Sequence, residues 1–228
     1  MIWIIVIGFM LLSWIASSRL KRKFTKYSQV QLGSGLSGAE IAQLMLRDNG
    51  INDVDVISVE GHLTDHYNPV NKTVNLSPDV YHGRSAASAA VAAHECGHAV
   101  QHATAYSMLQ FRSAMVPIQN VSGQIMNTII MISIFGGAFL FSMGINNILL
   151  ILIACQTVIT LFSLVTLPVE YDASKRALAW VQERNIVNSD EHAMAKDALN
   201  AAASTYLISA LGSITMLLYY VLSFLGND

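Results

Sequence analysis

The run ILLILIACQTVITLFSLVTL, residues 148–167, decides the fold class. It contains no charged residue and is long enough for a helix that crosses the hydrocarbon core of a bilayer, which needs roughly 20 mainly apolar residues. The composition agrees, because 53% of the 228 residues are hydrophobic and only 12% are charged, whereas a soluble domain carries about 25% charged residues. The sequence therefore predicts a mainly α-helical integral membrane protein.

Three further apolar runs complete a predicted set of four spans. The first covers about residues 1–17, the second about 118–143, the third about 146–167 and the last about 206–225. In the first run the positive charges follow the apolar residues, which argues against a cleaved signal peptide and favours an uncleaved anchor. The second and third runs are joined by a short turn and are expected to form a transmembrane hairpin.

Basic residues predict the side that each connecting segment faces, because lysine and arginine concentrate in cytoplasmic loops. A first cluster follows the first run, and a second lies between the third and fourth runs; the residues are Arg19, Lys21, Arg22, Lys23 and Lys26, then Lys175, Arg176, Arg184 and Lys196. We therefore expect cytosolic segments at about 28–115 and 168–204, in a single functional unit of an inner or plasma membrane.

Charge and cysteine content exclude some classes of protein. The net charge of −2 offers no broad basic surface for a phosphate backbone, so a nucleic-acid partner is not expected. The chain has two cysteines, Cys96 and Cys155, which do not form the dense disulfide framework of a small secreted protein. Both are expected to be free thiols.

The segment 28–115 has the pattern of a small α+β portion. Ser37 and Glu40 are spaced as a capping box that opens a helix, and Gly50 is expected to end it. Residues 54–77 alternate β-branched and polar residues around turn signals, which predicts two or three short strands. The alanine-rich stretch 86–108 predicts one long helix.

That alanine-rich helix contains AAHECGHAVQHA, residues 92–103, with an HExxH pattern. Residues four apart on a helix lie about 6 Å apart along its axis and on the same face, so His94 and His98 can direct both imidazoles to one ion. Glu95 is placed to hydrogen-bond a water on that ion, which suits a general base in peptide hydrolysis. The pattern predicts a Zn²⁺ site of the metallopeptidase kind.

Neighbouring residues are excluded as ligands of the same ion. His102 lies about 12 Å along the axis from His94, too far for both to bind one zinc at about 2 Å. The longer zincin pattern needs a histidine where this chain has Thr104. Cys96 is expected to point away from the ion and to pack in the interior.

A catalytic zinc usually takes three protein ligands and a water. The stretch LPVEYDASKRAL, residues 167–178, supplies a third ligand in Glu170. Two predicted spans separate Glu170 from the motif, so topology returns it to the cytosolic side. Asp172 is a competing ligand in the same stretch, whereas Glu183 and Glu191 have surroundings typical of a solvated helix face.

The sequence resembles the YugP-type family of neutral zinc metallopeptidases, which are bacterial membrane proteins. The resemblance covers most of the chain and is carried by the basic cluster after the first span, HYNPVNKTVNLS, VAAHECGHA, the apolar hairpin and EYDASKRA. It implies His94, His98 and Glu170 as zinc ligands and Glu95 as the catalytic residue, in the gluzincin manner of HtpX/Ste24-like proteases.

One position departs from those better-studied relatives, in which an aspartate commonly follows the ligand glutamate by four residues and steadies a zinc histidine. That position is Ser174 here. We take Asp172 as the candidate substitute. Arg176 is a further candidate, since it lies one to two helical turns after Glu170 and can pair with a carboxylate of the site.

Two other features are candidates for roles in catalysis. A donor to the oxyanion could come from a group of histidines and tyrosines near the predicted sheet, although such residues more often satisfy local hydrogen bonds: His62, His66, Tyr67, His102 and Tyr106. The strand NKTVNLS is either an exposed edge that pairs with an extended substrate or an ordinary structural strand.

Together these features predict a four-span membrane zinc endopeptidase with a zincin-like cytosolic portion. Its substrates would be membrane or membrane-associated polypeptides, cleaved at the cytosolic face beside the lipid bilayer. One alternative is a site-2-type intramembrane protease, which the polar residues on both sides of the motif disfavour. The other is a non-catalytic membrane scaffold that keeps zinc for structure.

Overall fold

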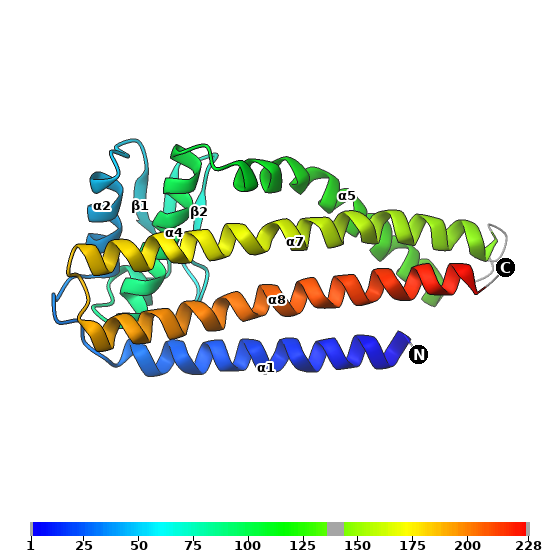
Figure 1. Cartoon of the computed structure of the whole chain (residues 1–228), viewed down its shortest axis with the longest axis horizontal. Helices are drawn as coiled ribbons and strands as arrows, with labels where there is room; N and C mark the ends of the chain where they lie inside the picture. The colour runs from blue at the N-terminus through cyan, green and yellow to red at the C-terminus, as the bar shows by residue number, and fades with distance from the viewer. Residues whose placement is uncertain (1, 136–143, 227–228) are drawn as a thin grey trace. The chain divides into compact units, whose positions relative to one another are not determined.

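The computed structural model describes residues 2–135 and 144–226, which are mostly helical (Figure 1). The helices are α1 (Ile2–Ser28), α2 (Gly38–Asp48), α3 (Pro78–Tyr81), α4 (Ala86–Ala103), α5 (Ser107–Phe135), α7 (Ile145–Glu183) and α8 (Ser189–Leu225), and the strands are β1 (Asp55–Ser58), β2 (His66–Asn68) and β3 (Thr73–Leu76). The chain forms two compact units. One contains α5 from Phe111 onward with the apolar parts of α1, α7 and α8, and the other, here called the site unit, comprises residues 15–110 and 168–205.

Three helices in the described part of the chain are long and apolar enough to cross a membrane, namely α1, α7 and α8. They correspond to the first, third and last predicted spans. The second predicted span, 118–143, is not supported, so the prediction of four spans is corrected to three among the described residues. The physical reason is that the described part of this run, 118–135, is interrupted by polar side chains such as Gln119, Asn120 and Gln124, and residues 136–143 lie outside the described residues.

The candidate membrane helices extend beyond the predicted limits of their apolar runs. Helix α1 continues through the basic cluster to Ser28, α7 continues past Leu167 to Glu183, and α8 begins at Ser189, well before Tyr206. Lysine, arginine, glutamate and alanine are all good helix formers, so the end of an apolar run need not end a helix. The predicted cytosolic helices of 168–204 are therefore the polar parts of α7 and α8.

Helix α2 begins as predicted. Ser37 accepts a hydrogen bond from the Glu40 backbone N–H at 3.2 Å, and Glu40 accepts one from the Ser37 N–H at 2.7 Å, which completes the capping box. Gly50 follows the helix with a φ of +70°, a conformation that favours glycine. At the other end Gly38 lies so close to the Val80 carbonyl that a side chain there would clash, which brings α2 against α3.

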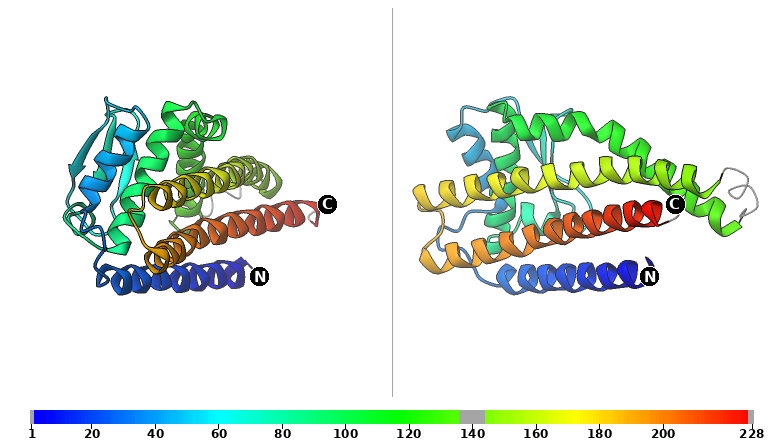
Figure 2. Two further views of the ribbon diagram at one scale, coloured as in Figure 1. Left: turned by 60° about the vertical axis from the view of Figure 1, so that its left-hand side comes forward. Right: turned by 45° about the vertical axis from the view of Figure 1, so that its right-hand side comes forward.

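The predicted small sheet is present, with strand order β1-β3-β2. Strand β3 pairs in parallel with β1 and antiparallel with β2. The strand NKTVNLS, which contains β3, is therefore central and is not the edge that one sequence hypothesis required. Strand β2 is an edge of this sheet instead. The left view of Figure 2 shows α2 and α4 beside the strands, and these elements pack together.

The predicted long helix 86–108 is divided in two. Helix α4 ends at Ala103, Ala105 adopts a φ of +51°, and α5 begins at Ser107. The Thr104 hydroxyl donates to the Val100 carbonyl at 2.8 Å, and the Tyr106 N–H donates to the Gln101 carbonyl at 2.9 Å, so the last carbonyls of α4 are satisfied without further helix. A left-handed alanine is uncommon and has no sequence signature.

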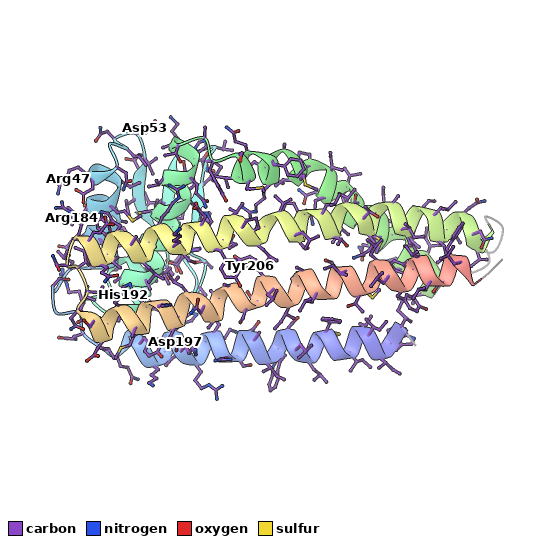
Figure 3. All side chains as sticks on the ribbon, viewed as in Figure 1. Arg47, Asp53, Arg184, His192, Asp197 and Tyr206 are labelled. Atoms are coloured by element: carbon purple, nitrogen blue, oxygen red, sulfur yellow. The ribbon has the colours of Figure 1, made fainter. Side chains whose placement is uncertain are left out.

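The polar parts of α1 and α8 are joined by side chains within the site unit. Asp197, labelled in Figure 3, accepts hydrogen bonds from Lys23 and from the Tyr27 hydroxyl, the latter at 2.6 Å. The buried Glu191 accepts from the Gly33 N–H and the Asn188 N–H, both at 2.7 Å, and so caps α8. Glu191 is thus a structural residue and does not lie on the solvated face that the sequence suggested.

Candidate metal centre

His94 and His98 lie on consecutive turns of α4 and face the same carboxylate. The Nε2 atoms of His94 and His98 are 3.4 and 3.7 Å from Oε2 of Glu170 on α7. One ligand atom from each of the three residues lies within 4.8 Å of the others. Glu170 is only 4% exposed, and the histidines are partly exposed. The structure thus brings together the three residues that the sequence selected as ligands.

Two of the three residues between the histidines, Cys96 and Gly97, pack against neighbouring helices. A Cβ at Gly97 would lie 2.6 Å from the Ala173 carbonyl oxygen, so only glycine permits this separation. Cys96 is fully buried on the other side of α4, with its Sγ 3.5 Å from the Ala42 carbonyl of α2. Figures 1 and 2 show α4 passing next to the start of the polar part of α7. The two variable positions of HExxH therefore fix the neighbours of the motif helix.

Each histidine is contacted by a polar side chain at its other ring nitrogen. Nδ1 of His94 is 3.1 Å from the Ser174 hydroxyl. Nδ1 of His98 is 3.0 Å from Oε1 of Gln101, one turn further along α4. From the sequence we interpreted Ser174 as the replacement of an aspartate, and we predicted no role for Gln101. A glutamine three residues after His98, on the alanine-rich motif helix, was the available signal.

Asp172 and Arg176 lie behind Gln101 rather than against a histidine. Asp172 Oδ2 accepts hydrogen bonds from Gln101 Nε2 at 2.8 Å and from Arg176 Nε at 2.6 Å. The Arg176 guanidinium in turn lies over the Tyr106 ring, 5.9 Å from its centroid. We predicted that Asp172 would contact Nδ1 of a zinc-binding histidine. Instead, Nδ1 of His94 is contacted by Ser174 and Nδ1 of His98 by Gln101.

The electrostatics of the cluster suit a cation. Burial by itself would lower the pKa of His98, but the close carboxylate of Glu170 and the nearby carboxylate of Glu95 hold that pKa above its ordinary value. A positive charge between these groups is therefore favoured. Either a proton or a metal ion can supply that charge.

Glu95 is kept apart from the three-residue cluster. Its carboxylate is buried and accepts a hydrogen bond from the backbone N–H of Tyr67 at 3.0 Å. Tyr67 lies in the edge strand β2, so the edge of β2 that does not pair with β3 faces the motif helix. Glu95 is therefore adjacent to His94 in sequence, but it is directed to the sheet.

The remaining candidates have local partners. His102 Nδ1 is 2.8 Å from the Tyr67 hydroxyl, and the group of His94, His98 and Glu170 does not include His102. His66 Nδ1 is 2.8 Å from the Thr64 carbonyl, and His62 Nε2 is 3.9 Å from Asp79. Glu183 is exposed. None of these contacts assigns a residue to the oxyanion.

Comparison with known proteins agrees with this geometry. A family model described as "Putative neutral zinc metallopeptidase" matches residues 2–225. The "Putative membrane protease YugP" of Bacillus subtilis (strain 168) is 39% identical over 218 residues, which cover 95% of this chain and 94% of the relative. No solved structure gives a significant match. The HECGH helix, the glutamate on α7 and this similarity along the whole chain thus agree, and the chain belongs to the neutral zinc metallopeptidase family named by that model.

Proposed function

We propose that this protein is a membrane zinc endopeptidase in which His94, His98 and Glu170 hold Zn²⁺ and Glu95 is the general base. The observation that carries the proposal is the convergence of the three ligand atoms within 4.8 Å, with the Glu95 carboxylate held apart from them. The family description implies zinc. The relative's name implies a protease, and it is carried over to this chain only as part of the proposal.

The donor set fits zinc. Ligand atoms about 2.0–2.1 Å from a tetrahedral ion lie about 3.3–3.4 Å from one another. The separations of 3.4 and 3.7 Å between the histidine Nε2 atoms and Glu170 Oε2 are close to this value. Two imidazoles and one carboxylate also match a known set of catalytic zinc ligands, which leaves room for a water.

The proposed chemistry divides between the ion and the protein. When bound, Zn²⁺ would polarise the scissile carbonyl and make a water acidic enough to attack it near neutral pH. The Glu95 carboxylate would accept the proton of the attacking water and later return it to the leaving amine. The hydrogen bond from the Tyr67 N–H would hold the Glu95 carboxylate in position for this role.

Strand β2 supports a polypeptide substrate. Its edge faces the motif helix and is not paired with another described strand. An extended peptide can add to such an edge through main-chain hydrogen bonds, which do not depend on side-chain identity. The Tyr67 N–H of this edge is already bonded to Glu95, so a substrate strand would pair with the other main-chain groups of the edge and run past Glu95. We propose β2 in place of β3 as the docking edge.

The proposed location is a membrane protein with its site on the cytosolic side. It is supported by the apolar helices α1, α7 and α8 and by the basic residues that follow the first and third apolar runs. Glu170 follows the end of the apolar run at Leu167 by only three residues. Membrane or membrane-associated polypeptides are therefore the proposed substrates.

The test combines zinc analysis and casein cleavage for the purified full chain, two variants of the site and one control variant. Glu95→Gln should keep its zinc and lose at least about 100-fold in cleavage rate, because a positioned general base contributes that much or more. Glu170→Ala should lose both zinc and cleavage. Glu183→Gln, at an exposed glutamate of the same helix, is the matched control and should change neither.

The outcomes separate the competing functions. Wild-type protein with stoichiometric zinc and no cleavage of casein or of membrane-protein substrates would favour a scaffold. Full zinc content and activity in Glu170→Ala would remove Glu170 from the ligand set. Full activity in Glu95→Gln would exclude the proposed general base.

A further inference from the structure

Gln101 is a fully buried polar side chain whose hydrogen bonds link the motif helix to α7. Its Oε1 is 3.0 Å from His98 Nδ1, and its Nε2 is 2.8 Å from both the Val169 carbonyl and Asp172 Oδ2. We propose that Gln101 is a positioning residue that sets the tautomer and orientation of His98 for zinc. This inference rests on the proposed function, because it assigns a role toward the proposed ion.

The partners of Gln101 determine which way its amide points. An amide oxygen and nitrogen are hard to tell apart by shape alone, so the hydrogen-bond network must decide. The Val169 carbonyl only accepts, and the Asp172 carboxylate also only accepts, since it is paired with Arg176 at 2.6 Å. Both amide hydrogens must therefore point toward α7, and the amide oxygen must face His98.

The orientation of the amide fixes the state of the His98 ring. Because Oε1 of Gln101 can only accept, Nδ1 of His98 must carry the hydrogen that bonds to it. The lone pair of a neutral ring is then on Nε2, the atom that faces Glu170 at 3.7 Å. That is the tautomer a zinc ligand needs. The contacts from Arg176 through Asp172 and Gln101 to His98 therefore fit one arrangement, with the hydrogen on Nδ1 of His98 and the lone pair on Nε2.

The same contacts explain how Asp172 acts without contacting a histidine. Asp172 is bonded to Gln101 and Arg176, and its effect on His98 passes through the Gln101 amide. A direct aspartate would hold the histidine by charge. Here a neutral amide holds it, and the charge of Asp172 orients that amide. Gln101 also bonds to Val169, the neighbour of Glu170, so one side chain positions ligands on both helices.

The first experiment measures zinc affinity by competition with a chelator. Gln101→Met, which has a similar volume and no hydrogen-bonding amide, should weaken zinc binding by about 10–100-fold, the usual effect of removing the partner of a ligating histidine. Gln43→Met, at an exposed glutamine of α2, is the matched control and should bind zinc like the wild type. Thermal unfolding of both metal-free variants shows that the fold is kept.

The second experiment exchanges donor and acceptor, and it remains decisive even if Gln101→Met fails to fold. Gln101→Glu places a carboxylate against the Asp172 carboxylate and should weaken zinc binding. Adding Asp172→Asn restores a donor opposite the new glutamate and keeps the total charge, although the Val169 carbonyl still lacks its donor, and it should recover at least about tenfold of the lost affinity. A purely space-filling role for Gln101 predicts that relief of the charge repulsion restores the thermal stability of the metal-free protein, with zinc affinity the same in the single and double variants.

These results distinguish the inference from the proposed function. If the wild type binds no zinc, the proposed function fails. If the wild type binds zinc and cleaves casein, but folded Gln101→Met binds zinc equally well, only the role of Gln101 is overturned. That role is also overturned if the exchanged pair binds zinc no better than Gln101→Glu alone.

Discussion

The two helices that form the candidate metal centre contribute to it in different ways. Helix α4 supplies both histidines, and their separation is fixed by one helical turn of the same element. Helix α7 supplies Glu170, whose position depends on the close contact of Gly97 with Ala173 and on hydrogen bonds between the helices. The histidine pair is therefore a local feature, whereas the third ligand is a product of tertiary packing.

The strongest test of this difference is Gly97→Ala, which leaves all three ligands in place. The new Cβ would lie 2.6 Å from the Ala173 carbonyl, so α7 must move away from α4. We expect a loss of about 1–3 kcal/mol in the free energy of unfolding, as for other overpacked interiors. Zinc affinity should fall as well, because Glu170 moves with α7. Denaturant unfolding and zinc competition measure the two effects.

Gly123→Ala is the control for the effect of replacing a helical glycine. A Cβ at Gly123 in α5 meets nothing within 4 Å, so this variant should be neutral or slightly stabilising. If Gly97→Ala bound zinc as tightly as Gly123→Ala, the position of Glu170 would not depend on the close contact of the two helices.

A smaller effect is expected from Ser174→Ala, which removes the hydroxyl that α7 places at Nδ1 of His94. A hydroxyl can donate or accept, so Ser174 at 3.1 Å from His94 Nδ1 does not impose a tautomer as Gln101 does on His98. We expect zinc affinity to fall by up to about 10-fold, the low end for such contacts. If Ser174→Ala lost more zinc affinity than Gln101→Met, Ser174 would be the more important partner of a zinc-binding histidine.

The smallest effect is expected where α7 is tied to α2, far along the helix from Glu170. Asp48 accepts two hydrogen bonds from Arg184 at 2.6 and 2.8 Å and one from Trp180 at 3.0 Å (Arg184 is labelled in Figure 3). The Arg184 side chain is 50% exposed, so solvent screens the pair. Asp48→Asn should therefore cost about 1 kcal/mol or less and leave zinc affinity unchanged.

The same pair predicts a pH dependence. The hydrogen bond from Arg184, followed by that from Trp180, lowers the pKa of Asp48 below its ordinary value of 3.8. The stabilisation is therefore present above that value and is lost as the pH falls through the lower pKa of the folded state. The difference in unfolding free energy between wild type and Asp48→Asn should shrink below pH 3.8, and an unchanged difference would contradict the assignment.

The sequence predicted the features that depend on neighbouring residues within one helix. The Ser37 and Glu40 spacing indicated the capping box of α2, and the spacing of His94 and His98 placed both rings on one face of a helix. Glu170 was reached differently, by counting two spans between it and the motif. The structure supports only one of those two spans in its described residues, yet places Glu170 against both histidines directly.

The features that the sequence did not predict depend on contacts between distant segments. Gln101 looks like an ordinary polar residue of a helix until Val169 and Asp172 are packed against it. The end of α4 is set by a left-handed Ala105, a residue type with no preference for that conformation. Strand order likewise put β3 in the centre, which an alternating pattern does not encode.

The reactivity of Cys96 can report on the packing of α4 against α2. Its side chain is buried against α2, and burial raises the pKa of the thiol well above its ordinary value, so the nucleophilic thiolate is scarce in the folded protein. An alkylating reagent can therefore modify this sulfur only during moments when the motif helix separates from α2. The alkylation rate of Cys96 would therefore report how often the HECGH segment separates from α2, without any measurement of catalysis.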